Sequence, residues 1–212
     1  MNSNSSTIPY SEACERNKDP ILKVIRPYLM AVNRVLEIGS GTAQHAIFFA
    51  DALPHLRWQT ADQEHYLEGI RAQLNNAKLT NVESPLEIDV NQATWLAKPD
   101  KYPLVYTANT LHIMSEVEVR KFFTGLNQVI DDDAILIIYG PFCYHGKFTS
   151  QSNADFDASL RSRGVGSGIR DFELIQSLAK ELNFSLIEDV PMPANNQTLV
   201  WQHQSEEKSC ES

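Results

Sequence analysis

The strongest constraint on the fold of this chain is a regular alternation between short apolar segments and longer segments with helical periodicity. The short segments carry near-continuous apolar side chains, which is typical of strands covered by helices on both faces of a sheet. Helices between them favour right-handed βαβ units, and the last two segments are expected to pair antiparallel. The expected strands lie at residues 34–38, 58–61, 86–88, 104–108, 134–139, 184–187 and 198–201. The sequence therefore predicts an α/β fold with a doubly wound, mostly parallel sheet.

The organisation along the chain indicates one domain. The chain has 212 residues, 42% of them hydrophobic, which is enough for a single domain with a sizeable core. Residues 8–204 are expected to form that domain, and the polar segments 1–7 and 205–212 are expected to be disordered tails. Asp19 and Pro20 have the pattern of an N-cap followed by a first-turn proline, so the first helix is expected to start there.

Charge and cysteine content narrow the classes of partner and compartment. The formal net charge of −9 disfavours duplex nucleic acid as a partner, although a structured RNA held by one local patch stays open. Cys14, Cys143 and Cys210 lie too far apart for a disulfide framework or a zinc spacing, so no metal site is expected. Neither a secretory signal nor a membrane-spanning apolar stretch is apparent, which predicts a soluble, cytoplasmic protein.

Glycines and acidic residues follow three of the expected strands. Gly39 and Gly41 leave the first strand and open a helix, while Asp62 and Asp89 follow the second and third strands. An acidic residue about 20 positions beyond such a turn is placed to bind a ribose diol, and Asp89 would face adenine. A plain tight turn would explain the glycines alone. The acidic residues favour a nucleoside site, and Gln44, where a dinucleotide fingerprint needs a small residue, disfavours a pyrophosphate cofactor.

The residues around this turn also carry a family resemblance. Residues 35–43 (VLEIGSGTA) resemble the first motif of class I S-adenosylmethionine (SAM)-dependent methyltransferases, with Ala43 where a third glycine is usual. Nearly the whole chain resembles a small methyltransferase-like family known as a domain of unknown function. The segments that carry this second resemblance are 15–20 (ERNKDP), 37–46, 108–113 (ANTLHI), 139–142 (YGPF), 147–150 (KFTS), 168–172 (GIRDF) and 192–196 (MPANN).

The resemblance implies a seven-stranded sheet with an antiparallel last strand and SAM lying across the strand ends. It places the methionine part of SAM at residues 39–41, the ribose at Asp62, adenine at Asp89 and Val90, and the sulfonium over Asn109. Ala43 is expected to make the pocket slightly tighter. The segment with Arg16 and Asn17 either closes the same cleft or forms a network before the first helix. The expected cofactor-binding residues are Arg16, Asn17, Glu37, Gly39, Ser40, Gly41, Thr42, Asp62, Asp89, Val90 and Asn109.

Candidate residues for the methyl acceptor lie in later segments. His112 is the candidate catalytic base because histidine titrates near neutral pH, or it orders its loop by hydrogen bonding. Residues 143–170 resemble a long loop, expected to be a cover over the substrate or a solvated excursion. Trp95 either flanks adenine or is a core aromatic. The expected substrate-binding residues are Tyr144, Lys147, Arg170, Asn195 and Asn196, the last two with a turn as the alternative.

These features predict SAM-dependent methyl transfer to a small or medium acceptor with an oxygen, nitrogen or sulfur nucleophile, leaving S-adenosylhomocysteine as product. Residues 109–112 (NTLH) differ from the signature of enzymes that methylate exocyclic base amines. This difference disfavours nucleobases as methyl acceptors. The alternative is a non-catalytic SAM- or nucleoside-binding module that serves a regulatory or partner role. A nicotinamide oxidoreductase is a third reading, disfavoured by Gln44.

Overall fold

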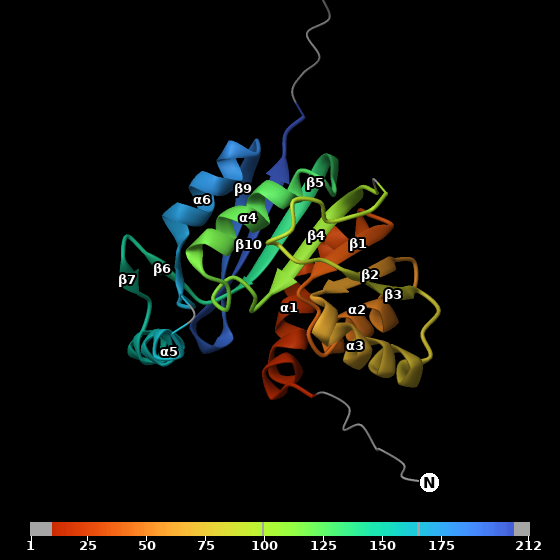
Figure 1. Ribbon diagram of the computed structural model, residues 1–212, viewed down its shortest axis with the longest axis horizontal. Helices are drawn as coiled ribbons and strands as arrows, with labels where there is room; N and C mark the ends of the chain where they lie inside the picture. Colours follow the sequence, from red (N-terminus) through yellow and green to blue (C-terminus); the bar gives the residue numbers. More distant parts are fainter. Residues whose placement is uncertain (1–9, 99, 165, 206–212) are drawn as a thin grey trace, which may run out of the picture.

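The computed structural model describes residues 10–98, 100–164 and 166–205, which form a central sheet covered by helices on both faces (Figure 1). The expected tail 1–7 lies outside the described residues, as does all of the expected tail 205–212 except residue 205. The helices are α1 (Glu12–Met30), α2 (Gln44–Ala52), α3 (Glu64–Ala77), α4 (Glu116–Leu126), α5 (Gln151–Arg161) and α6 (Phe172–Glu181). No helix within these ranges has both the length and the apolar character needed to cross a membrane.

The main sheet confirms the predicted topology. Its strand order is β3-β2-β1-β4-β5-β10-β9 over the described residues, and β10 is antiparallel to both of its neighbours. The strands are β1 (Arg34–Ile38), β2 (Arg57–Asp62), β3 (Val82–Glu87), β4 (Tyr102–Ala108), β5 (Ile130–Gly140), β9 (Phe184–Met192) and β10 (Asn196–His203). The order reverses between β1 and β4, which pair in parallel. A crevice at the carboxyl ends of these two strands is where sheets of this kind bind ligands.

Two clusters of buried side chains fix the sheet between its helices. Residues from α1 and α2, such as Ile25 and Phe49, pack with Trp58 and Tyr106 on one face. Residues from α4 and α6, such as Phe122, pack on the other face with strand residues of even number along β5. Because the strands bury side chains on both faces, their near-continuous apolar sequence is explained.

The first helix begins earlier than the sequence pattern predicts. Ser11 is the N-cap, and its side chain accepts a 3.3 Å hydrogen bond from the backbone N–H of Cys14. The expected start at Asp19 and Pro20 is therefore wrong, because Pro20 lies inside α1. A serine N-cap with glutamates in the first turn outweighs the missing N–H of one proline. As a result, an additional two turns of helix lie beside the carboxyl ends of the strands.

Residues 143–170 are not a loop, and that expectation is also wrong. They contain α5 and most of a small second sheet with the order β7-β6-β8, formed by Phe142–Tyr144 (β6), Lys147–Phe148 (β7) and Arg170–Asp171 (β8). Ser150 caps α5 by accepting a 3.1 Å hydrogen bond from the N–H of Asn153. A small separate apolar cluster holds the segment together, with Leu160 packing against Cys143 and Ile169. Figure 1 shows this lobe to one side of the main sheet.

Candidate functional site

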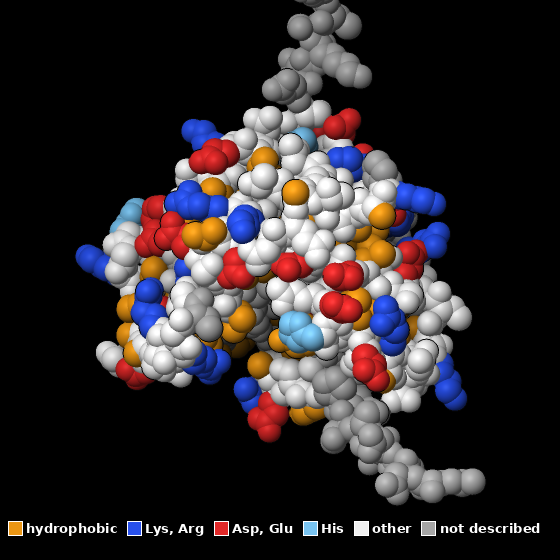
Figure 2. All heavy atoms as spheres, in the orientation of Figure 1, with side chains coloured by type: hydrophobic (Ala, Val, Ile, Leu, Met, Phe, Trp, Pro, Cys, Tyr) orange, Lys and Arg blue, Asp and Glu red, His pale blue; other side chains and the backbone are white. Residues whose placement is uncertain are grey.

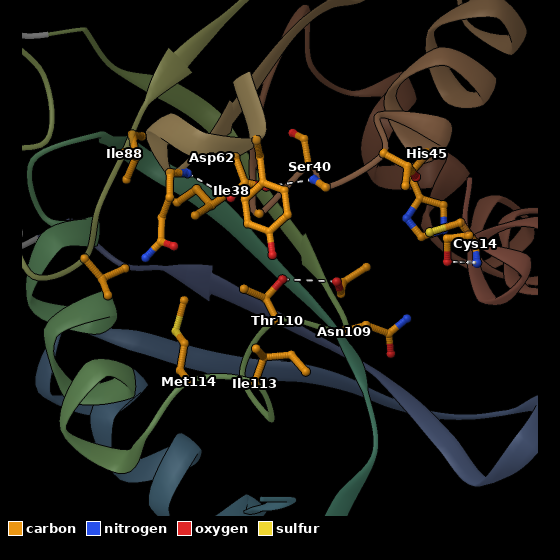
Figure 3. Close-up of a pocket in the computed structure, with 18 of the residues that line it drawn as sticks. Cys14, Ile38, Ser40, His45, Asp62, Ile88, Asn109, Thr110, Ile113 and Met114 are labelled. Carbon is orange, nitrogen blue, oxygen red and sulfur yellow. Dashed lines mark hydrogen bonds between the residues drawn. The ribbon is translucent and has the colours of Figure 1, made fainter. Parts of the chain in front are cut away.

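A cavity of about 480 Å³ opens at the carboxyl ends of β1 and β4, where the strand order reverses. Figure 3 shows Asp62 and Ile88 on one side of it, Ile113 and Met114 on another, and Cys14 with His45 at one end. A volume of this size suits a small ligand or cofactor. The lining residues are Ser11, Cys14, Ile38, Gly39, Ser40, Gly41, Thr42, His45, Asp62, Gln63, Tyr66, Ile88, Val90, Ala108, Asn109, Thr110, Ile113, Met114 and Glu118.

The glycine turn after β1 forms one wall of the cavity. Gly39 and Gly41 have φ values of +77° and +53°, which glycine adopts without steric cost. A Cβ on Gly39 would lie 2.7 Å from Oγ1 of Thr110, whereas a Cβ on Gly41 would meet nothing within 4 Å. The turn therefore packs tightly against β4 on one side and leaves bare backbone facing open space on the other. Ala43 takes the place of the usual third glycine with φ of +58° and is fully buried.

Asp62, the last residue of β2, ties that turn in place. Its Oδ2 accepts a 2.7 Å hydrogen bond from the N–H of Gly41, and its Oδ1 accepts a 2.8 Å bond from the N–H of Gln63. Burial raises the pKa of Asp62, while the two backbone donors oppose that rise. Each carboxylate oxygen can accept more than one hydrogen bond. Asp62 is thus able to hold the turn and bind a ligand hydroxyl at the same time.

Glu37 lies behind the turn and is not among the residues that line the cavity. Its Oε2 accepts hydrogen bonds of 3.0 Å from the hydroxyl of Ser40 and 3.2 Å from the indole N–H of Trp58. Burial raises the pKa of Glu37 to about 7, an effect to which the nearby Asp62 adds. The Ser40 hydroxyl is used within the protein, because it also accepts a 3.2 Å bond from the N–H of Ala61. Glu37 and the Ser40 side chain therefore shape the turn from behind.

An apolar slot lies next to Asp62. Ile88 and Val90 follow β3 and line the cavity together with Met114. Asp89, between the first two, is outside the lining, and its Oδ1 accepts a 2.9 Å hydrogen bond from the N–H of Asn91. Ile88 and Val90 line the site, whereas Asp89 does not. The predicted role of Asp89 at adenine thus has no support from this geometry.

The end of the cavity near α1 carries residues that the sequence pattern did not single out. They are Ser11, the N-cap of α1, with Cys14 of α1 and His45, and they lie next to Thr42, which was expected at the site. Nε2 of His45 lies 2.7 Å from Oδ1 of Asn17, and burial lowers the pKa of His45 to about 4. His45 could have been predicted at the site, because it is the second residue of the helix that follows the glycine turn. The early start of α1 could not be read from the sequence, so its first turn was not expected at the site.

Arg16 and Asn17 do not line the cavity, although both were expected to bind the cofactor. Arg16 is exposed and forms a 3.1 Å ion pair with Glu12 on the same helix. Asn17 is half-buried and reaches the cavity wall only through His45. Neither residue belongs to a loop before the first helix, because both are part of α1.

Asn109, expected at the sulfonium, and His112, expected as the base, are separated by the turn after β4. Asn109 lines the cavity with φ of +57°, a left-handed conformation that asparagine tolerates. His112 is buried outside the lining, with its ring edge-to-face against Phe156 at a centroid distance of 5.3 Å. Burial lowers the pKa of His112 to about 4, and Arg170 adds to that effect. His112 is therefore neutral at pH 7 but does not face this cavity.

The expected substrate-binding residues are not brought together at the cavity. The hydroxyl of Tyr144 donates a 2.8 Å hydrogen bond to Asp189, and Lys147 is exposed on β7. Arg170 is buried, and its guanidinium donates bonds of 2.7 and 3.1 Å to the carbonyls of residues 168 and 166. These geometries give structural roles to Tyr144 and Arg170.

Asn195 ends the short 3₁₀ turn between β9 and β10, and Asn196 is the first residue of β10. The carbonyl of Asn195 accepts a 2.9 Å bond from the Asn153 side chain, and Asn195 donates a 3.1 Å bond to Ser152, so this turn is tied to α5. Asn196 donates to the carbonyls of residues 193 and 194 at 3.2 and 3.4 Å. Both side chains therefore stabilise this turn, which was the alternative reading.

Trp95 is a core residue. It is buried against Phe122 and Gly125 and is absent from the cavity lining. Within the described ranges, no group of three or more His, Cys, Asp or Glu residues is arranged to hold a metal ion.

Solved structures share this fold with the chain. SibL, a SAM-dependent methyltransferase solved in its apo form, has a TM-score of 0.72 and 20% identity over 91% of this chain and 56% of its own. A putative O-methyltransferase from Nostoc punctiforme PCC 73102 has a TM-score of 0.75 and 14% identity over 89% and 56%. PigF, solved with SAH, has a TM-score of 0.70 and 14% identity over 87% and 57%. The chain thus spans less than two thirds of these proteins, and the likeness establishes the Rossmann-like methyltransferase fold.

A family model covers almost all of the described domain. It carries the description "Protein of unknown function (DUF938)" and matches residues 8–203. That range includes the glycine turn, Asp62 and both edge strands of the main sheet, β3 and β9. The chain therefore belongs to the DUF938 family.

Proposed function

We propose that the cavity binds SAM and that the protein transfers its methyl group to a small or medium acceptor with an oxygen, nitrogen or sulfur nucleophile. S-adenosylhomocysteine would be the product. The proposal is supported by the charge of the cavity. Among the described residues that line it, Asp62 and Glu118 carry carboxylates, and none is a lysine or an arginine. Such a lining suits a cationic sulfonium and disfavours a pyrophosphate, which basic side chains usually bind.

The order of the lining residues along the cavity supports the assignment. The apolar slot formed by Ile88, Val90 and Met114 would hold adenine, and the Asp62 carboxylate would accept hydrogen bonds from the ribose hydroxyls. The bare backbone at Gly41, with open space where a Cβ would lie, leaves room for the methionine part.

When bound, SAM would supply a methyl group on a positively charged sulfur. A lone pair of the acceptor forms the new bond to the methyl carbon, the carbon–sulfur bond breaks with its electrons on sulfur, and the acceptor proton passes to solvent. The residues of this chain contribute chiefly by alignment. Asn109 lies where it can contact both the cofactor and the acceptor, since it lines the cavity at the end of β4.

Titration calorimetry with S-adenosylhomocysteine tests the cofactor assignment. The wild-type protein is expected to bind it with a dissociation constant in the micromolar range, and NAD is expected to give no heat. Asp62→Ala should weaken binding at least tenfold, and Gly41→Arg should abolish it. The matched control is Asp132→Ala, an exposed acidic residue of β5, which should leave affinity unchanged. NAD binding, or equal heats for all variants, contradicts the proposal.

A non-catalytic SAM-binding module is the second candidate, and the position of His112 favours it. The expected base is buried outside the cavity lining, and His45, a histidine that does line the cavity, lies 2.7 Å from Oδ1 of Asn17 and has a pKa lowered to about 4. Incubation with SAM and a pooled metabolite extract separates the two functions. Formation of S-adenosylhomocysteine above a Gly41→Arg control supports the enzyme. Binding of SAM without turnover in extracts of varied origin supports the module.

A further inference from the structure

Glu118 is the second carboxylate on the cavity lining, and its side chain joins two segments that border the apolar slot. Its Oε1 accepts a 3.1 Å hydrogen bond from the side-chain amide of Asn91, the residue after Val90. Its Oε2 accepts a 2.7 Å bond from the backbone N–H and a 2.8 Å bond from the hydroxyl of Ser115, the residue after Met114. The carboxylate of Glu118 therefore bridges the segments that carry Val90 and Met114.

The contacts of this carboxylate keep it charged and fixed in orientation. The hydrogen bonds from Ser115 hold the pKa of Glu118 below its usual value, and the nearby Lys121 adds to that effect. Nζ of Lys121 donates a 2.8 Å bond to Oδ1 of Asn91, so the amide nitrogen of Asn91 must face Glu118. Ser115 and Glu118 also form the capping box of α4, with a 3.3 Å bond from the N–H of Glu118 to the Ser115 hydroxyl. The cavity lining thus includes an ionised acceptor that the protein itself holds in place.

One acceptor position on Glu118 is left for a ligand. Each carboxylate oxygen has two lone pairs, so the two donors of Ser115 fill Oε2, whereas Asn91 fills half of Oε1. Among the described residues, Asn91 is the one donor to Oε1. A ligand in the slot can therefore complete the hydrogen bonding of Glu118 with an N–H or O–H group. Figure 2 shows acidic side chains gathered in the middle of the face on which α4 and β3 lie, so a ligand oxygen there would face negative charge.

Adenine carries such a donor on the edge that faces away from the ribose. With the ribose at Asp62 and the base in the slot, the amino group at C6 is the part of adenine furthest from the sugar. We propose that Oε1 of Glu118 accepts a hydrogen bond from this amino group, which makes Glu118 the residue that selects adenine over hypoxanthine. Hypoxanthine has a carbonyl oxygen in place of the amino group, and that oxygen would face Oε1 of Glu118 without a hydrogen between them. The inference rests on the proposed function and adds the residue that recognises the base.

Asp89, which the sequence pattern placed at adenine, is the competing residue. It lies outside the cavity lining, and its Oδ1 accepts a 2.9 Å hydrogen bond from the backbone N–H of Asn91. Asn91 thus contacts both carboxylates, through its N–H to Asp89 and through its side chain to Glu118. Asp89 shapes the segment after β3, and Glu118 is the one of these two carboxylates that lines the cavity.

Titration calorimetry with S-adenosylhomocysteine and with S-inosylhomocysteine, its deaminated form, tests the inference. The wild-type protein is expected to prefer the adenosyl form by about tenfold, the lower end for a hydrogen bond to a charged group, because Glu118 is half-buried. Glu118→Gln should reduce this preference to less than about twofold, since glutamine keeps the capping box but places its NH₂ group toward the base. The NH₂ group cannot accept from adenine and can donate to the oxygen of hypoxanthine.

Two matched variants separate this contact from other effects of charge. Glu116→Gln removes a carboxylate from the same helix, but Glu116 is exposed, pairs with Arg120 and is outside the lining, so this variant should keep the wild-type preference. Asp89→Asn tests the competing residue and should also keep the preference. Urea unfolding of each variant checks that the fold is retained.

A crystal structure of the wild-type complex makes the test independent of the variants. An adenine amino nitrogen within hydrogen-bond distance of Oε1 of Glu118 supports the inference. Equal affinity of the wild type for the two ligands, a full preference in Glu118→Gln, or its loss in Asp89→Asn overturns it. Wild-type protein that binds S-adenosylhomocysteine without contact to Glu118 refutes only the role of Glu118, and protein that binds neither compound refutes the proposed function as well.

Discussion

The backbone N–H of Gly41 donates a 2.7 Å hydrogen bond to the carboxylate of Asp62, 21 residues further along the chain. This bond joins the ends of β1 and β2 at the edge where the cavity opens. It also fixes which way the glycine turn faces, because it uses the N–H at the tip of the turn. One side chain therefore shapes the cavity and is available to bind what enters it.

Asp62→Asn tests the shaping role alone. The amide keeps the size of the side chain, but it loses the charge, and its NH₂ group cannot accept from the N–H of Gly41. We expect a loss of stability of about 1.5–3 kcal/mol, as for a hydrogen bond to a charged group. Urea unfolding measures it, with Asp132→Asn as the exposed control. Equal midpoints for the two variants would show that the bond is unimportant for the turn.

Glu37 predicts a dependence of stability on pH. Its pKa is raised to about 7 in the fold from 4.5, so the folded state holds the proton more tightly than the unfolded chain does. The stability from protonated Glu37 is fully present below pH 4.5 and is lost as the pH rises through 7. Glu37→Gln is neutral throughout, so it should gain up to about 3 kcal/mol relative to wild type across this window. Thermal unfolding at several pH values measures the difference. Parallel curves for the two proteins would rule out this titration.

Gly39 predicts a steric effect separable from backbone strain. Gly39→Ala places a methyl group 2.7 Å from Oγ1 of Thr110 at a φ of +77°. Gly146→Ala is the control, because Gly146 has a φ of +69° with nothing within 4 Å. Both variants carry the conformational cost, so we expect Gly39→Ala to be less stable than the control by about 1–3 kcal/mol. It should also weaken binding of S-adenosylhomocysteine. Matching unfolding curves for the two variants would mean that Thr110 moves aside freely.

Gly125 predicts a defect in packing away from the site. A Cβ there would lie 2.0 Å from the ring of Trp95, so the indole occupies the space beside Gly125. Gly125→Ala must displace the indole and is expected to cost about 1–3 kcal/mol. Affinity for S-adenosylhomocysteine should change less than twofold, because Trp95 does not line the cavity. Thr124→Ala, next to it on the exposed face of α4, is the control for stability. A large loss of affinity in Gly125→Ala would show that Trp95 contributes to ligand binding, as in the reading that places it beside adenine.

Local patterns in the sequence predicted the sheet and the residues at its strand ends well. Buried strands with helices between them, a glycine turn and Asp62 about one βαβ unit later are all short-range features. Gly39, Ser40, Gly41, Thr42, Asp62, Val90 and Asn109 line the cavity as the positions along the strands imply. Their roles in binding stay predictions until a ligand is bound.

Long-range packing decided the features that the sequence could not predict. Ser11 and Asp19 both fit an N-cap, and the choice of Ser11 depends on the first turn of α1 packing beside Gln44, whose side chain accepts a 2.6 Å bond from the Ser11 N–H. The ring of His112 packs against Phe156 of α5. The sequence of this segment shows little helical periodicity, so α5 was not predicted. Both contacts join residues far apart in the sequence, so local sequence patterns could not predict them.

A crystal structure of the complex with S-adenosylhomocysteine tests the cofactor assignment most directly. We predict that the ligand fills the cavity with its ribose hydroxyls on the Asp62 carboxylate, its adenine between Ile88 and Met114, and its sulfur close to Asn109. An unchanged cavity in crystals grown with saturating ligand, or the ligand bound at another surface, would contradict the assignment.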